Sequence, residues 1–277
     1  MRIRHLFALM TTTHLVFGCG GKADTGEGSD TDSDSDTDAV TDTDESNQSV
    51  EKNAYLNGIV VWADGSAAEG LQMRLCHSSC YVASSDADGV YEFPGVEASA
   101  YTLQAVVTGD ETYGTPTTPI TLEADTTREL GAWVVPQFTT SETITGASEV
   151  ELEGGLTVTA DPDAVSRGTY SVSDEASVWS VRVEPDEAGI LLEGIEGTVV
   201  GLWYLGNYDL QLEPAWSLGG VLELGLDAGT ELQVWTASNA DKGWSDNGVV
   251  TVGENGTLTQ SEGVGLSQLT TLLLVQE

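Results

Sequence analysis

The fold is decided by the stretch Leu56-Asn57-Gly58-Ile59-Val60-Val61-Trp62, which is followed directly by Ala63-Asp64-Gly65-Ser66. Apolar, β-branched and aromatic side chains fill the first part, as is typical of a β-strand. The Asp64-Gly65 pair is a strong hairpin signal, because glycine readily adopts the positive φ that tight turns need. The sequence therefore predicts a strand that ends in a turn just after residue 62.

The same alternation of short apolar runs and turns continues to about residue 136. Further strands are predicted at 70–76, 80–83, 90–93 and 101–107. The segment Asp86-Ala87-Asp88-Gly89 predicts a tight turn, in which aspartate side chains accept hydrogen bonds from the local backbone. Because the span holds about seven short strands and shows no helical periodicity, residues 53–137 are predicted to form a β-sandwich.

Residues 141–277 show a second run of the same kind. Glycine, aspartate and asparagine separate the predicted strands, and the length suits one domain. The predicted strands are 156–159, 178–183, 199–204, 211–213, 231–235, 248–252 and 270–275. The predicted fold class is therefore all-β, with two tandem β-sandwich domains.

The first of these domains resembles the carboxypeptidase regulatory-like domain, a transthyretin-type β-sandwich. The likeness covers about 80 residues and lies in the order and spacing of several short motifs. They are Gly58-Ile59-Val60, Gly70 to Leu75, Ser85 to Phe93, Gly95-Val96 and Tyr101-Thr102-Leu103. The resemblance implies a domain without catalytic activity that serves as a spacer, a stabiliser or a binding module.

Two cysteines, Cys76 and Cys80, flank His77-Ser78-Ser79. They fall on two predicted strands joined by a three-residue loop, which is close enough for a disulfide. An oxidising compartment outside the cytoplasm favours this bond. The alternative is a metal or redox site that uses His77, although no second group of ligands completes a tetrahedral site.

The N-terminus has the parts of a secretory signal, predicted to span residues 1–18. Arg2 and Arg4 precede an apolar run that ends in Leu15-Val16-Phe17-Gly18-Cys19. This end resembles the bacterial lipobox, which implies that Cys19 carries a diacylglyceryl group and palmitate-type acyl chains. Gly20 follows where the enterobacterial retention signal has aspartate, and this favours the outer membrane. The alternative is an ordinary secretory signal with a chance cysteine.

Residues 19–52 are predicted to be a disordered acidic linker behind the lipidated cysteine. Its centre alternates aspartate with serine and threonine from Ser29 to Asp38. Such a segment has too little apolar surface to offset the entropy of ordering, and its charges extend it. Asp34, Asp36, Asp38 and Glu45 match an EF-hand register, but Ala39 replaces the required glycine. Weak, diffuse binding of divalent cations is therefore favoured over a specific calcium site.

The tryptophans divide by their surroundings into predicted core and predicted binding residues. Trp179, Trp203 and Trp235 lie within apolar strands and are assigned to the core. Trp216 and Trp244 lie in polar, glycine-rich surroundings and are the candidates for stacking on a sugar ring.

Charge and motifs limit the function classes. The formal net charge is −36 and no basic cluster exists, so binding to nucleic acid is excluded. The sequence has no serine-hydrolase elbow, zinc-protease helix or phosphate loop, so we expect no catalytic residues, cofactor or metal. A hydrolase with paired carboxylates is left open.

The predicted function is that of a non-catalytic envelope lipoprotein that presents β-sandwich binding or structural domains. Its expected partners are membrane lipid, through the acyl anchor, and an envelope protein or polysaccharide. The alternative is a carbohydrate-binding module at the cell surface.

Overall fold

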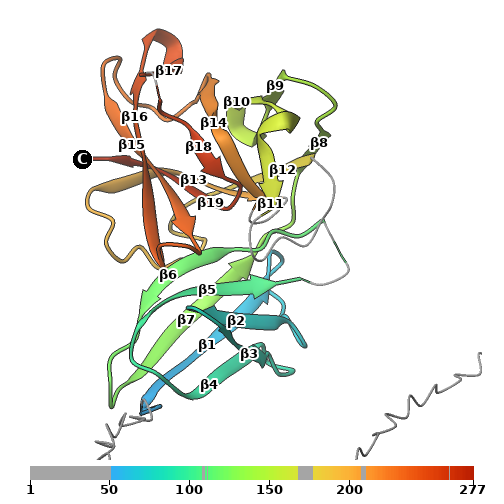
Figure 1. Cartoon of the computed structure of the whole chain (residues 1–277), viewed down its shortest axis with the longest axis vertical. Coiled ribbons are helices and arrows are strands. Elements are labelled where there is room, and N and C mark those ends of the chain that lie inside the picture. The colour runs from blue at the N-terminus through green and yellow to red at the C-terminus, as the bar shows by residue number, and fades with distance from the viewer. Residues whose placement is uncertain (1–50, 108–109, 111, 168–176, 207–209, 262) are drawn as a thin grey trace, which may run out of the picture. The chain divides into compact units, whose positions relative to one another are not determined.

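The computed structural model describes residues 51–107, 110, 112–167, 177–206, 210–261 and 263–277. The predicted signal, Cys19 and nearly all of the acidic linker lie outside these residues. The described residues belong to one compact unit, Ser49–Glu277. No helix in this part of the chain has the length and hydropathy needed to cross a bilayer. As predicted, the fold is all-β (Figure 1).

Seven strands, β1 to β7, form the first sandwich, coloured blue through green in Figure 1. One sheet has the order β4-β1-β7 and the other β3-β2-β5-β6. The pairings are antiparallel except that of β1 with β7, which is parallel. The bounds are β1 Ala54–Trp62, β2 Gln72–Cys76, β3 Cys80–Ser84, β4 Val90–Val96, β5 Ala100–Val106, β6 Thr117–Thr121 and β7 Thr127–Val135.

Alternation along the strands builds the core of the first sandwich. In β1 the buried residues Ala54, Leu56 and Val60 alternate with more exposed ones. Their apolar side chains pack against those of the facing sheet, including Met73, Leu75 and Leu103. Burial of each such side chain contributes about 1.5–3 kcal/mol, which makes this core the main stabilising element of the sandwich.

The turn before β4 has the predicted local structure. The Oδ1 atom of Asp86 accepts hydrogen bonds from the backbone N–H groups of Asp88 and Val90, at 3.0 and 2.9 Å. Gly89 has a φ of +78°, and a Cβ atom there would lie 2.3 Å from the carbonyl oxygen of Val60. The aspartate and the glycine are thus explained by the turn alone.

In the described residues after 137, twelve strands follow, β8 to β19, and they form the second sandwich from two sheets. One sheet has the order β11-β14-β10-β9, with β18 paired to β14; the other is β17-β16-β15-β19-β13-β12-β8. The bounds are β8 Thr140–Thr143, β9 Ser148–Glu151, β10 Leu156–Ala160, β11 Val165–Arg167, β12 Ser177–Val183, β13 Thr198–Gly206, β14 Leu210–Gly220, β15 Glu231–Ser238, β16 Gly243–Val252, β17 Leu258–Gln260, β18 Leu266–Gln268 and β19 Thr271–Gln276. Apolar residues of both sheets form one shared core.

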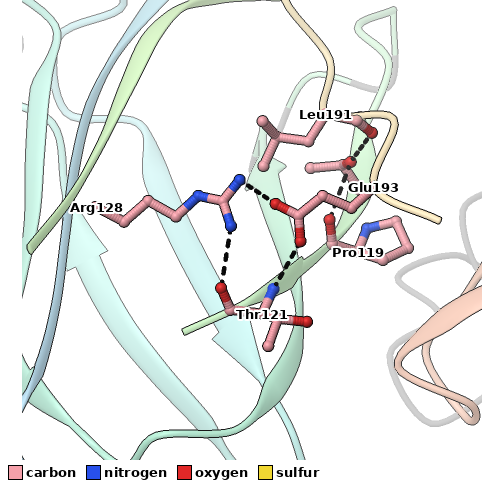
Figure 2. A network of polar contacts seen from close by, with 6 residues as sticks. Pro119, Thr121, Arg128, Leu191 and Glu193 are labelled. Atoms are coloured by element: carbon pink, nitrogen blue, oxygen red, sulfur yellow. Dashed lines mark hydrogen bonds and ion pairs between the residues drawn. The ribbon is translucent and has the colours of Figure 1, made fainter. Parts of the chain in front are cut away.

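The loop of residues 184–197, between β12 and β13, joins the second sandwich to the open side of the first. Figure 2 shows Glu193 accepting a hydrogen bond from the Thr121 N–H and pairing with Arg128. Arg128 in turn donates to the Thr121 carbonyl at 3.0 Å. Thr118 donates to the carbonyl of Leu191 at 2.7 Å, and Leu191 packs against the core of the first sandwich. The loop therefore completes both the hydrogen bonds and the core of the first sandwich.

A second junction is buried and polar. The Asn239 side chain, at the end of β15, accepts hydrogen bonds from Thr102 Oγ1 and Gln104 Nε2, both on β5. The Thr271 hydroxyl accepts from the backbone N–H of Thr117 and donates to the carbonyl of the same residue. All five residues are buried. Because partners in both sandwiches satisfy these groups, separating the sandwiches leaves buried polar groups to be hydrated.

We predict that Asn239→Ala destabilises the protein by about 1–3 kcal/mol, because the buried donors of Thr102 and Gln104 lose their acceptor. Urea unfolding of the full chain measures the change. Asn53→Ala is the matched control, since the Asn53 side chain donates one hydrogen bond to Asp125 near the surface; it is expected to change stability by less than about 0.5 kcal/mol. Equal effects of the two substitutions would contradict the proposed role of the junction.

The hairpin between β15 and β16 gives a pH-dependent prediction. Hydrogen bonds from Ser245 and Ser238 lower the pKa of Asp241 from its ordinary value of 3.8. A carboxylate whose pKa is lowered by folding stabilises the folded state above its unfolded pKa, and this contribution disappears as the pH falls through the folded pKa. Asp241→Asn should therefore lower stability at neutral pH by less than about 1 kcal/mol, since the group is largely solvated.

Thermal unfolding followed across the acid range measures this difference between Asp241→Asn and the unchanged protein. We expect the two unfolding temperatures to begin to converge as the pH falls below 3.8 and to meet once it lies below the lowered pKa of the folded state. A difference that stays constant at low pH would show that the carboxylate charge has no part in it.

Candidate ligand-binding site

Of the two predicted sugar-stacking tryptophans, Trp216 is misassigned. Its side chain is 2% exposed and its indole N–H donates to the carbonyl of Asp161 at 3.2 Å. Trp216 lies on β14 opposite Leu266 of β18 and belongs to the core of the second sandwich. The polar residues next to it in sequence point away from this core. Polar neighbours in sequence therefore did not indicate that the tryptophan itself is exposed.

Trp244, the other predicted stacking residue, is half-buried. It lies on β16 and packs against a small apolar cluster on the seven-stranded sheet, which includes Leu202 and Tyr204. Its indole nitrogen is buried, and the ring is partly covered by this cluster. Among the three predicted core residues, Trp203 is fully buried, whereas Trp179 and Trp235 are half-buried.

The aromatic pair that the structure does place at a hollow is Trp62 with Tyr113. The ring centres are 4.7 Å apart and the ring planes are tilted by 52°. Both side chains pack against the core of the first sandwich and both are only half-buried. The pair thus has a rigid support beneath it and a partly exposed aromatic surface.

Polar side chains complete this hollow, which encloses about 290 Å³. Glu69, Gln72 and Asp110 line it together with the two rings. Hydrogen bonds from the side chain and backbone of Thr112 lower the pKa of Asp110, so its carboxylate stays ionised at neutral pH. Carboxylates and the amide oxygen accept hydrogen bonds, so the hollow combines an aromatic platform with acceptors for hydroxyl groups.

The local backbone explains the position of both rings. Trp62 is the last residue of β1, and its N–H and carbonyl close the following turn with Ser66 and Gly65. Asp64 stabilises the turn by accepting from the Ser66 N–H at 2.9 Å. Tyr113 forms an isolated bridge with Gln137, which brings the segment after β5 beside the end of β7.

Sequence reasoning recognised Trp62 only as part of a strand and did not single out Tyr113. The available signal was the position of a tryptophan at the end of a strand, next to an Asp-Gly turn, where a ring is less often enclosed. The pairing with Tyr113, 51 positions further on, follows from the fold and has no local signature.

The predicted disulfide is present between Cys76 and Cys80, with Cα atoms 4.0 Å apart. It closes the hairpin between β2 and β3. The His77 ring lies 5.9 Å from that of Tyr101 in an edge-on arrangement. In the part of the chain that the structure covers, no three histidine, cysteine, aspartate or glutamate residues gather in a group able to hold a metal ion.

The sequence matches no protein-family model and no curated protein. The assignment of residues 53–137 to the carboxypeptidase regulatory-like family therefore stays a prediction. Several solved structures are similar over most of the chain, at low identity.

The Streptococcal ancillary pilin is 10% identical over 83% of this chain, with a TM-score of 0.25, and this chain spans 54% of it. A DUF3823 family protein from Bacteroides ovatus is 12% identical, with 81% and 82% of the two chains covered and a TM-score of 0.23. The Bacillus anthracis TIE protein is 9% identical, with 81% and 48% covered and a TM-score of 0.27. TM-scores this low transfer no function to this chain.

Proposed function

We propose that this chain is a non-catalytic binding protein of the bacterial cell envelope and that the Trp62–Tyr113 hollow is its carbohydrate site. The predicted lipid anchor at Cys19 and the acidic linker of residues 19–52 would hold the folded unit away from an outer-membrane surface. The observation that carries the proposal is the supported, half-exposed ring pair beside Glu69, Gln72 and Asp110.

The chemistry of a sugar ring matches this hollow. One face of a pyranose presents C–H groups that pack on an aromatic ring, while its edge presents hydroxyl donors. The two rings offer the packing surface, and the carboxylates of Glu69 and Asp110 accept from hydroxyl groups. A neutral pyranose in a polysaccharide is the ligand that uses both features without bringing a further negative charge to an acidic protein.

A binding role is favoured over a hydrolase by the character of these carboxylates. Glu69 and Asp110 are exposed, and hydrogen bonds lower the pKa of Asp110. A general acid in a glycosidase instead needs a raised pKa, which burial provides. The features of the hollow thus suit recognition of hydroxyl groups, and we assign no catalytic residue.

We predict that Tyr113→Ala weakens binding to a neutral polysaccharide by about tenfold, because it removes one of two rings in contact with the sugar. Affinity electrophoresis of the full chain in detergent, in gels cast with a panel of neutral glucans, mannans and xylans, measures the retardation. Trp62→Ala should have an equal or larger effect.

Tyr55→Ala is the matched control, since Tyr55 is 44% exposed and lies on β1 away from the hollow. It should leave the retardation unchanged. If the unchanged protein migrates freely through every gel of the panel, or if Tyr113→Ala is retarded as strongly as Tyr55→Ala, the carbohydrate assignment of the hollow is wrong.

We predict that Cys19→Ala releases the protein from membranes. Each buried CH₂ group of an acyl chain contributes about 0.8 kcal/mol, so two or three chains give stable attachment. Intact-mass measurement of protein taken from membranes should show an increase that corresponds to acylation. An unmodified mass, with the protein in the medium, would instead indicate an ordinary secretory signal.

A further inference from the structure

A second cleft lies where the two sandwiches meet, and it encloses about 570 Å³. Val134 and Pro136, from the end of β7 and just beyond it, line one side. Val181, Arg182, Glu153 and Gly154 line the other. The cleft is therefore built by both sandwiches and combines apolar walls with a positive charge.

The side chain of Arg182 is held in a fixed position in this cleft. Its guanidinium carbon lies 5.5 Å from the centre of the Trp203 ring, which belongs to the residue directly opposite on β13. The Arg182 side chain also lies close to Gly154, where a Cβ atom would lie 2.8 Å from Arg182 Cδ. Gly154 also has a φ of +78°, so glycine is required there on both grounds.

The neighbouring turn is as well fixed as the arginine. Glu153 Oε2 accepts a hydrogen bond from the backbone N–H of Arg182 at 2.7 Å. The carbonyl of Glu153 accepts from the indole N–H of Trp203 at 2.8 Å. The backbone N–H of Glu153 donates to the Ser180 hydroxyl. These bonds fix the turn and the backbone of Arg182, and the guanidinium itself is positioned by its contact with the Trp203 ring. This contact reduces the cost of ordering the side chain on ligand binding.

Arg182 forms no ion pair with any carboxylate of the described ranges, although Glu153, Glu184 and Glu187 line the same cleft. Arg128, in contrast, is paired with Glu193. Arg74 likewise has no carboxylate partner and donates to Gln72 Oε1 at 2.7 Å. What distinguishes Arg182 is its place in the cleft beside the Trp203 ring. A half-buried guanidinium retains strong hydrogen-bond donors for a planar anion.

The composition of the cleft identifies the ligand. Arg182 is the one cation among the residues that line the cleft, and its planar guanidinium fork matches a carboxylate. The three glutamates of the lining repel every anion, but they repel a doubly charged phosphate more strongly than a singly charged carboxylate. The same glutamates accept hydrogen bonds from hydroxyl groups, and the valine and proline walls suit a carbon ring.

We propose that this cleft binds a hexuronic acid residue, whose carboxylate pairs with Arg182. Its hydroxyl groups donate to Glu184 and Glu187, and one ring face packs on Val134 and Pro136. The site is separate from the Trp62–Tyr113 hollow and requires no part of the function proposed for it.

Calorimetric titration of the full chain in detergent with an α-1,4-linked galacturonic acid trimer tests the proposal. We expect saturable binding that is at least about tenfold weaker in Arg182→Gln, because a charge-assisted bidentate pair contributes a factor of that order. The neutral galactose trimer of the same linkage should bind at least about tenfold more weakly than the acidic one, since its C6 hydroxyl forms no ion pair.

Two further variants keep the test decisive. Arg182→Lys retains the charge and much of the packing on Trp203 but not the planar fork; it should also weaken binding, and it replaces Arg182→Gln if that variant does not fold. Lys52→Gln removes one positive charge elsewhere, over the Tyr81 ring, and should not change the affinity.

The proposal is overturned if the neutral and acidic trimers bind alike, or if neither arginine variant binds the acidic trimer more weakly than the unchanged protein. Trp62→Ala, measured in the same titration, should bind the acidic trimer normally. Loss of neutral polysaccharide binding in that variant with retained uronate binding would therefore separate the two sites.

Discussion

The buried edge at β6 is the constraint on which the rest of the structure depends. Thr117 and Thr118 are 0% and 1% exposed, yet β6 lies at the edge of its sheet, where half of its backbone groups have no strand to pair with. The partners of this edge come from beyond residue 140. The Thr271 hydroxyl accepts from the Thr117 N–H, the Leu191 carbonyl accepts from the Thr118 hydroxyl, and the Glu193 carboxylate accepts from the Thr121 N–H. A buried polar group left unpaired costs about 1–3 kcal/mol, so the first sandwich is stable in this form only when the second covers it.

Two arginines near this junction, Arg128 and Arg182, each lie beside a glutamate, but only Arg128 forms an ion pair with it. The Glu193 carboxylate points at Arg128, and both groups also bond to the backbone of Thr121, so the charge is neutralised within a closed network (Figure 2). The Glu153 carboxylate instead accepts from the backbone N–H of Arg182, and the guanidinium is directed onto Trp203. One arrangement fixes the sandwiches together, and the other keeps a cation available in the cleft.

Local pattern located the strands with long apolar runs, but it missed β6 to β9, β11, β17 and β18, and it was insufficient for the sites. The alternation of apolar and polar residues, together with Asp-Gly turns, predicted β1, β4 and most of β12 to β19. A strand with one buried face shows this alternation in consecutive residues, so it can be recognised locally. Trp216 was misassigned because its burial depends on β18, about 50 residues later. The contacts of Asn239 with Thr102 and of Thr271 with Thr117 join residues 137 and 154 positions apart. Threonine and asparagine in strands and turns carry no signal of such partners, so neither the junction nor the cleft was predictable.

The two proposed sites differ in how they depend on the junction. Trp62 lines the hollow, and the next residue, Ala63, lines the cleft. Likewise Tyr113 lines the hollow, and its bridge partner Gln137 lines the cleft. The hollow is built from the first sandwich alone, whereas the cleft needs Val134 and Pro136 on one side and Arg182 on the other. A ligand in the cleft contacts both sandwiches and binds only their assembled form, so by linkage it stabilises the junction that creates its own site. A ligand in the hollow favours the folded first sandwich and reaches the junction only indirectly, through the β6 edge that the second sandwich covers.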